Sequence, residues 1–327
     1  MGTPGQESIR QYAAQLERIR QELSKIIVGQ EKIITGLLRA LLANGHVLVE
    51  GVPGTAKTLV IRALAAVTGC TFSRIQFTVD LLPTDITGIT IYEERKGFSI
   101  VKGPIFAEFV LADEINRAPA KTQSALLEAM QEKQVTIGKE TFRLQDPFFV
   151  MATQNPIEST GTYQLPEAQM DRFLFKILID YPSLGEEKTV IDTNINIHKF
   201  EEYQLKSVIE SKDIVKMQEV VKEIYLGEDV KKYIVSIVDA SRNPQKYNVA
   251  LGKYIEWGAS PRASINLSIA AKAEALLHAS SYVDPQFVKN VATDILRHRI
   301  LLNYEGIAEG IKTDEVVKEI LVKIPIP

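Results

Sequence analysis

A stretch of small residues that ends in a lysine and a threonine is the segment of this sequence whose chemistry is easiest to predict. Small residues let backbone N–H groups turn around phosphate oxygens at the start of a helix. A lysine at the end of the turn neutralises the β and γ oxygens of a nucleotide, and the next hydroxyl can bind Mg²⁺. We therefore predict a phosphate-binding loop at Gly51, Val52, Pro53, Gly54, Thr55, Ala56, Lys57 and Thr58.

The predicted loop departs from the usual pattern at one position, where Ala56 replaces the last glycine. Alanine keeps the loop small, but it is strained wherever the backbone needs a positive φ. A plain glycine-rich turn before a helix is the alternative interpretation. The short apolar segment at 46–50 and the helical pattern at 59–67 favour nucleotide binding.

Two adjacent carboxylates follow the apolar segment 109–112. At the end of a strand, Asp113 would lie near Mg²⁺ and Glu114 near an attacking water. The alternative is a strand end with two solvated acids. Their position, about 60 residues after the predicted phosphate loop, favours the catalytic interpretation.

A further polar side chain, that of Asn155, follows the apolar segment 148–152. Ligands of open α/β sheets bind at the carboxyl ends of the strands. Asn155 would then orient the water between Glu114 and the γ-phosphate. The alternative is a turn residue, because Pro156 comes next.

The elements that must position these residues are predicted from apolar spacing. Spacings of three and four residues indicate helices at 14–26, 33–42 and 59–67. Near-continuous apolar segments indicate buried parallel strands, with room for crossover helices between them. These strands are expected at 46–50, 73–77, 109–112, 148–152 and 173–179. We predict a doubly wound α/β domain over residues 1–184.

The rest of the chain has helical patterns only, at 213–224, 228–240, 263–278 and 285–301. Strands are expected to be absent after residue 184, so residues 185–327 are predicted to form a small all-α domain. Residues 185–199 are either a linker or the first helix of that domain.

Length and charge limit the possible functions. The chain has 327 residues, which suggests about two domains. Lysine and arginine total 38 and aspartate and glutamate 41, giving a net charge of -3. Neither predicted domain is basic, which argues against strong nonspecific binding of nucleic acid.

The remaining composition suggests a cytoplasmic protein. The single cysteine, Cys70, cannot form an intramolecular disulfide, which favours a reducing compartment. We see no signal peptide and no apolar stretch of about 18 residues, so no membrane insertion is expected. The four histidines are too far apart in sequence to suggest a metal other than Mg²⁺.

Five segments in a fixed order resemble the MoxR group of AAA+ ATPases. They are GVPGTAKT, VLADEINRAP, MATQNP, LPEAQMDRF and GASPRA, and the resemblance extends from about Ile27 to the C-terminus. It implies an AAA+ P-loop NTPase domain with a helical lid, and ATP and Mg²⁺ as cofactors. It also implies assembly into a ring of six subunits. It further implies chaperone-like remodelling or activation of protein clients, which includes the insertion of metal cofactors. ATPases of this group commonly work with von Willebrand factor A domain proteins that are encoded separately.

The resemblance also implies roles for particular residues. Arg172 matches the arginine finger, and Arg262 matches the second sensor, acting in its own subunit or in a neighbour's. The alternatives are an ion pair of Arg172 with Asp171 and a solvated helix-turn position for Arg262. The remaining assignments are Lys57 and Thr58 to the first nucleotide-binding motif, Asp113 and Glu114 to the second, Asn155 to the first sensor, and Val28, Gly29 and Gln30 to the adenine contact.

Alternation of apolar and polar residues on both sides of a turn predicts two β-hairpins, one with its turn at residues 93–97 and one with its turn at 138–140. They resemble the helix-2 insert and the pre-sensor-1 hairpin of the clade that holds magnesium chelatase and the minichromosome-maintenance helicases. The basic residues of the two hairpins are Arg95, Lys96, Lys139 and Arg143. They could contact a substrate in the pore of the ring. The alternative is that they are solvated residues at the hairpin tips, where neighbouring glutamates reduce the positive charge. Three roles are possible for Arg117: a contact in the pore, a contact at the subunit interface, or a surface charge.

Two other functions compete with an ATP-driven remodelling factor. A nucleic-acid motor of the same clade would show salt-dependent DNA binding. A nucleotide-gated scaffold with vestigial hydrolysis would fail a steady-state ATPase assay, but the presence of Lys57, Asp113, Glu114 and Asn155 argues against it.

Overall fold

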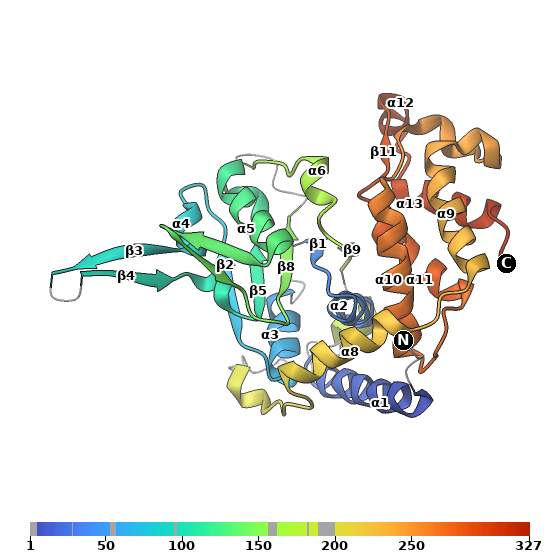
Figure 1. Cartoon of the computed structure of the whole chain (residues 1–327). Helices are drawn as coiled ribbons and strands as arrows, with labels where there is room; N and C mark the ends of the chain where they lie inside the picture. Colours follow the sequence, from blue (N-terminus) through green and yellow to red (C-terminus); the bar gives the residue numbers. More distant parts are fainter. Residues whose placement is uncertain are drawn as a thin grey trace.

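A parallel sheet with helices on both faces forms one part of the molecule, and a helical lid forms the other (Figure 1). This computed structural model describes residues 5–27, 29–52, 57–94, 97–155, 162–181, 183–188 and 200–327. Among the helices of these residues, none is long and apolar enough to cross a membrane.

The sheet has five strands in the order β2-β5-β8-β1-β9, and every neighbouring pair is parallel. The strands are β1 (Val47–Gly51), β2 (Phe72–Gln76), β5 (Phe109–Asp113), β8 (Phe149–Gln154) and β9 (Phe175–Ile179). The predicted doubly wound sheet is confirmed, with strand ends displaced by one or two residues. Because all five strands run the same way, their carboxyl ends meet at one edge.

Both faces of the sheet are covered, as the continuous apolar strands predicted. Side chains alternate between the faces, so Val47 and Val49 pack with the N-terminal helices while Leu48 faces the opposite cluster. One face carries α1 (Gln6–Leu23), α2 (Glu31–Leu42) and α3 (Lys57–Val67). The other face carries α5 (Ala120–Glu132).

Both predicted hairpins are present. The first consists of β3 (Gly88–Glu93) and β4 (Gly97–Lys102) and projects away from the sheet, on the side opposite the lid (Figure 1). The second consists of β6 (Gln134–Ile137) and β7 (Glu140–Arg143). Short elements complete this part: α4 (Pro83–Thr87), η1 (Pro104–Phe106), η2 (Ile115–Arg117) and α6 (Glu167–Met170).

The lid is helical, but the expectation that strands are absent after residue 184 is wrong. A two-stranded antiparallel sheet joins β10 (Ile255–Trp257) to β11 (Leu301–Leu302). The helix expected to reach residue 301 ends at Leu296, because the next three side chains turn inward to bond backbone carbonyls. The lid elements are η3 (Phe200–Tyr203), α8 (Ser211–Glu223), α9 (Glu228–Arg242), η4 (Pro244–Tyr247), η5 (Ala250–Tyr254), α10 (Pro261–Leu277), α11 (Pro285–Leu296), α12 (Tyr304–Ala308) and α13 (Thr313–Lys323).

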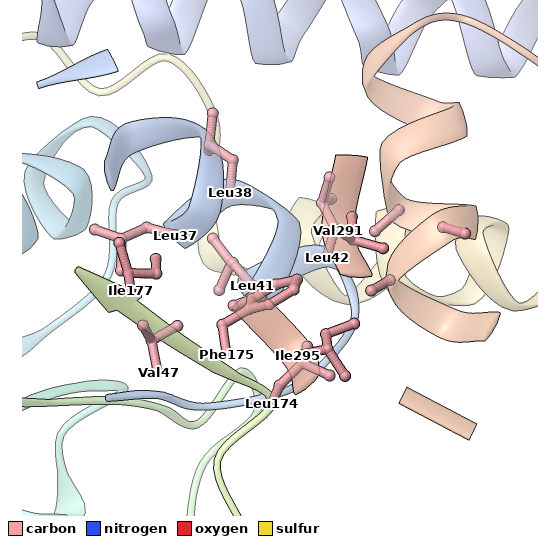
Figure 2. Close-up of a cluster of buried hydrophobic side chains, with 14 of the residues drawn as sticks. Leu37, Leu38, Leu41, Leu42, Val47, Leu174, Phe175, Ile177, Val291 and Ile295 are labelled. Carbon is pink, nitrogen blue, oxygen red and sulfur yellow. The ribbon is translucent and has the colours of Figure 1, made fainter. Parts of the chain in front are cut away.

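One hydrophobic cluster joins the sheet to the lid (Figure 2). Leucines of α2 lie between strand residues of β1 and β9 and the lid helix α11, where Val291 and Ile295 are fully buried. Helix α8 also packs on α2, and Gln218 Nε2 donates a 2.8 Å hydrogen bond to the Leu41 carbonyl. Since the core is continuous across residue 184, the domain division placed there stays a prediction.

A buried ion pair gives this junction a measurable contribution to stability. Arg39 of α2 donates two hydrogen bonds of 2.6 Å to Glu274 of α10, whose side chain is 2% exposed. Arg39→Met is expected to lower the free energy of unfolding by about 3–5 kcal/mol, because Glu274 would lose its buried counter-ion. Urea denaturation measures this, with Arg39→Lys as the control that keeps the charge and should lose less.

The pH dependence of the same pair follows from Glu274. Burial raises the pKa of this carboxyl, but the hydrogen bond and charge of Arg39, together with the Asn290 hydrogen bond and the charge of His278, hold the pKa below its ordinary value. A lowered folded pKa means that the contribution is present above about pH 4.3 and is lost as pH falls through the folded pKa. The difference between wild type and Arg39→Met should therefore shrink in acid; a constant difference would contradict the assignment.

Candidate active site

The predicted residues of the two nucleotide-binding motifs that the structure describes, together with Asn155, lie at the edge where the strands end. Gly51 is the last residue of β1, and Lys57 and Thr58 open α3. Asp113 ends β5, and Asn155 follows β8 with 7% of its surface exposed. The positions Val28, Pro53, Gly54, Thr55 and Ala56 lie outside the residues that the structure describes.

The ammonium group of Lys57 is partly buried and close to several carboxylates. Its Nζ donates a 2.5 Å hydrogen bond to the Gly51 carbonyl. Burial lowers the pKa of Lys57, while the charges of Asp113, Glu114 and Glu50 oppose that shift. A partly desolvated cation at a helix N-terminus is suited to bind phosphate oxygens.

The two acids are held by a residue that sequence reasoning missed. The hydroxyl of Thr153, on β8, donates to Asp113 Oδ1 at 2.6 Å and accepts from the backbone N–H of Glu114 at 2.9 Å. Glu114 has φ 56°, so the chain turns sharply there and separates its carboxylate from that of Asp113. This turn gives the two adjacent acids different surroundings.

Two further partners, Arg74 and Gln76, come from β2 and were also missed. Arg74 donates to Asp113 Oδ2 from Nε at 3.1 Å and from Nη2 at 2.7 Å. Gln76 Nε2 donates to Glu114 Oε2 at 2.7 Å, and Arg117 Nε lies 3.2 Å from the same oxygen. The available signal was the pair of polar residues, two apart, at the end of a strand that becomes the neighbour of β5.

The donor set fits a nucleotide with Mg²⁺. The Thr58 hydroxyl and the Asp113 carboxylate are oxygen ligands of the kind that Mg²⁺ prefers. When bound, Mg²⁺ neutralises charge on the phosphate oxygens. Lys57 would contact those oxygens directly, and Glu114 would be the carboxylate beside them that accepts a proton from water.

Arg172 lies apart from this cluster. Its Nη1 donates a 2.9 Å hydrogen bond to the Leu127 carbonyl of α5. Arg172 and Gln169 line a surface cavity of about 380 Å³ together with residues of α5, two of them glutamates. None of the contacts given above for Lys57, Asp113 or Glu114 involves Arg172.

Asp171 is paired with the lid instead of with Arg172. Its Oδ1 accepts from Arg299 Nε at 2.7 Å, and its Oδ2 lies 3.6 Å from Arg262 Nη1. Arg262 stands in the first turn of α10 with its side chain 45% exposed. The lid arginine is therefore ion-paired beside the segment that carries Arg172.

At the adenine-contact positions, Gly29 has φ +71°, which only glycine adopts without strain. A Cβ at this position would lie 2.5 Å from Glu186 Cδ. Gln30 is the residue before α2.

Comparisons with known proteins agree with this geometry. The model of the ATPase family associated with various cellular activities (AAA) matches residues 46–175, and that of the AAA lid domain matches residues 250–320. Chaperone MoxR1 of Mycobacterium tuberculosis is 46% identical over 325 residues, which cover 99% of this chain and 85% of that protein. The chain belongs to the MoxR family of AAA ATPases.

Other relatives extend this MoxR assignment. Protein MoxR of Paracoccus denitrificans is 29% identical, and the match covers 98% of both chains. The crystal structure of a candidate ATPase from Cytophaga hutchinsonii has a TM-score of 0.91 and 46% identity, and covers 98% of this chain and 97% of its own. This MoxR protein is thus a nucleotide-binding ATPase with a helical lid, as the motifs predicted.

Gly51 is a position where even alanine should disturb the MoxR site. A Cβ on Gly51 would lie 2.7 Å from the Ile179 carbonyl oxygen of β9, a backbone atom that cannot turn away. Gly51→Ala is expected to lower the free energy of unfolding by about 1–3 kcal/mol through overpacking, and to weaken nucleotide binding because the loop begins at this residue. Chemical denaturation and nucleotide titration measure the two effects. Gly5→Ala, with open space around the Cβ, is the matched control; equal stability of the two variants would contradict the prediction.

Proposed function

We propose that this MoxR-family ATPase binds ATP with Mg²⁺ and uses hydrolysis to remodel or activate protein clients. The observation that carries the proposal is the cluster in which Thr153 links Asp113 to Glu114 beside the start of the Lys57 helix. The cluster supplies a cation for phosphate, a carboxylate for Mg²⁺ and a carboxylate for proton transfer. The name of the M. tuberculosis relative, a chaperone, supports clients that are proteins.

The role of each residue is part of the proposal. Lys57 and Thr58 bind the phosphates and Mg²⁺, with Asp113 as the second ligand. Glu114 accepts the proton of the attacking water and Asn155 orients that water. Arg172 supplies positive charge to a neighbouring subunit's nucleotide, and Arg262 senses the nucleotide from the lid. The adenine is contacted by the segment Val28, Gly29 and Gln30, and the phosphates also by the backbone of Gly51, Val52, Pro53, Gly54, Thr55 and Ala56.

The proposed assembly is a cytoplasmic ring of six subunits. The partly buried Arg172, which donates to Leu127 rather than to the acids, supports a role that needs a second copy. Clients, von Willebrand factor A domain proteins among them, are proposed to bind such a ring. Nucleic acid is a less suitable partner because the charge is balanced, with 38 basic and 41 acidic residues.

Client capture tests the proposal. Tagged Glu114→Gln protein with ATP should retain clients that wild type releases after hydrolysis, and light scattering should show a hexamer. Lys57→Ala protein with ATP is the matched control for contacts that need no nucleotide. The proposal is contradicted if the two variants retain the same proteins, or if salt-sensitive DNA binding accounts for all that is captured.

A further inference from the structure

Three consecutive lid residues, Arg297, His298 and Arg299, bond the segment that carries Arg172. They follow α11, and their side chains are buried although two are charged, with 8%, 4% and 6% of each residue exposed. Charged side chains are rarely this buried unless they are paired. Each of the three has at least one partner that lies more than 120 positions earlier in the chain.

His298 and Arg299 bond the backbone on both sides of Arg172. Arg299 Nη2 donates to the carbonyls of Asp171 at 3.0 Å and of Phe173 at 2.6 Å, while Nε bonds the Asp171 carboxylate at 2.7 Å. His298 Nε2 bonds the Phe173 carbonyl at 3.2 Å. The residues directly before and after Arg172 are therefore both held by Arg299.

Arg299 is charged in this contact, whereas His298 is neutral. Burial lowers the pKa of Arg299 to about 10, against the opposing charge of Asp171, so the guanidinium is still a cation near neutral pH. Burial also lowers the pKa of His298 well below its ordinary value, so the imidazole is neutral. The buried cation is compensated by Asp171, the residue directly before Arg172.

Packing joins the same two segments. Leu174 and Phe175 lie in the cluster with Val291 and Ile295 of α11 (Figure 2). A second lid helix reaches the same place, since Arg262 at the start of α10 lies 3.6 Å from Asp171 Oδ2, which also accepts a 3.3 Å hydrogen bond from the Ser260 hydroxyl. The start of α10 and the turn after α11 thus both contact the chain at Asp171.

We propose that the Arg299–Asp171 pair is a positioning device that places Arg172 for the neighbouring subunit according to the position of the lid. The proposal rests on the proposed role of Arg172 as a finger. Because Arg262 and Arg299 share one carboxylate, a lid that moves with its own nucleotide would move the backbone on both sides of Arg172. The pair would link the lid of one subunit to hydrolysis in the next.

The rival explanation is that Arg299 only fastens the lid. The Arg39–Glu274 pair offers a matched comparison, because it is also a buried arginine–carboxylate pair between the lid and the N-terminal part, but it does not touch the Arg172 segment. Replacing either arginine with lysine keeps the charge and removes the planar set of donors. Loosening of the lid alone should therefore affect the two variants alike.

Mixed rings separate the two explanations. The acceptor subunit is Arg172→Ala, which keeps its pocket and lacks the finger. The donor is Lys57→Ala, whose own pocket is inactive but whose Arg172 can serve the acceptor. Three further donors add Arg299→Lys, Asp171→Asn or, as the control, Arg39→Lys to Lys57→Ala. Pull-down of tagged donors checks mixing, and ATPase kinetics of the mixtures give kcat and KM.

The Arg39→Lys donor should restore as much turnover as the plain donor. The Arg299→Lys and Asp171→Asn donors should restore about 10- to 100-fold less kcat, the effect expected of a group displaced by about 1 Å. The KM for ATP should not change, because the pocket belongs to the acceptor.

Equal restoration by all donors overturns the positioning proposal and leaves the finger intact. If the Arg39→Lys donor also fails to restore turnover, the positioning proposal is wrong, and Arg299 only fastens the lid. Donors with Arg299→Lys and Asp171→Asn that both fail to assemble count against it too, because the pair would then hold the interface. If even the plain Lys57→Ala donor restores nothing in confirmed mixed rings, the finger itself is wrong and the proposal falls with it.

Discussion

Lys57→Ala protein should lose most of its affinity for ATP, whereas Glu114→Gln protein should bind ATP normally and hydrolyse it hardly at all. Lys57 contributes a partly desolvated cation, and removing a charged hydrogen bond of about 1.5–3 kcal/mol weakens binding by about 10- to 100-fold. Glu114 is needed only when water loses its proton, a contribution of about 10²- to 10⁴-fold in rate. Titration calorimetry and a steady-state ATPase assay measure the two quantities.

Replacing Glu114 with glutamine removes the carboxylate but keeps the shape of the side chain. Its side-chain carbonyl can still accept the hydrogen bond from Gln76 Nε2, which now ends on Glu114 Oε2. Unchanged thermal unfolding would show that the site is intact. If the two variants lose ATP affinity equally, the separate roles assigned to Lys57 and Glu114 are wrong.

Arg172→Ala protein should bind ATP with unchanged affinity and lose turnover. A finger arginine supplied by a neighbour is worth about 10³- to 10⁵-fold in related nucleotide hydrolysis. The pocket residues Lys57 and Thr58 are untouched by the substitution, since Arg172 contacts the Leu127 carbonyl. Adding excess Lys57→Ala subunits should restore part of the activity, because each pairing joins an intact pocket to an intact finger.

Arg172→Lys is the matched control, because it keeps the charge but loses the planar guanidinium; it should recover only a small part of the rate. Normal turnover by Arg172→Ala protein alone would contradict the prediction. So would a mixture that recovers nothing although pull-down confirms mixed assembly. Arg172 would then be a structural residue that fastens its segment to α5 through the Leu127 carbonyl.

The five strands and the position of the paired acids at a strand end were predictable from the sequence, and the structure confirms both. These features depend on neighbours in the chain: an apolar strand places whatever follows it at the edge of the sheet, so the positions of Lys57, Asp113 and Asn155 could be predicted from local patterns. Both hairpins were predictable for the same reason, since turn and alternation lie within about 15 residues.

The partners of the polar groups could not be predicted from local patterns, because they come from distant parts of the chain. Thr153 and Gln76 reach Glu114 because β8 and β2 flank β5, and strand order is set by packing across the whole sheet. Asp171 pairs with Arg299 rather than with adjacent Arg172, and Arg297, His298 and Arg299, which the sequence pattern placed in a helix, are buried in the turn after it. A buried charge takes the partner that best offsets its desolvation, and that partner can lie anywhere in the chain.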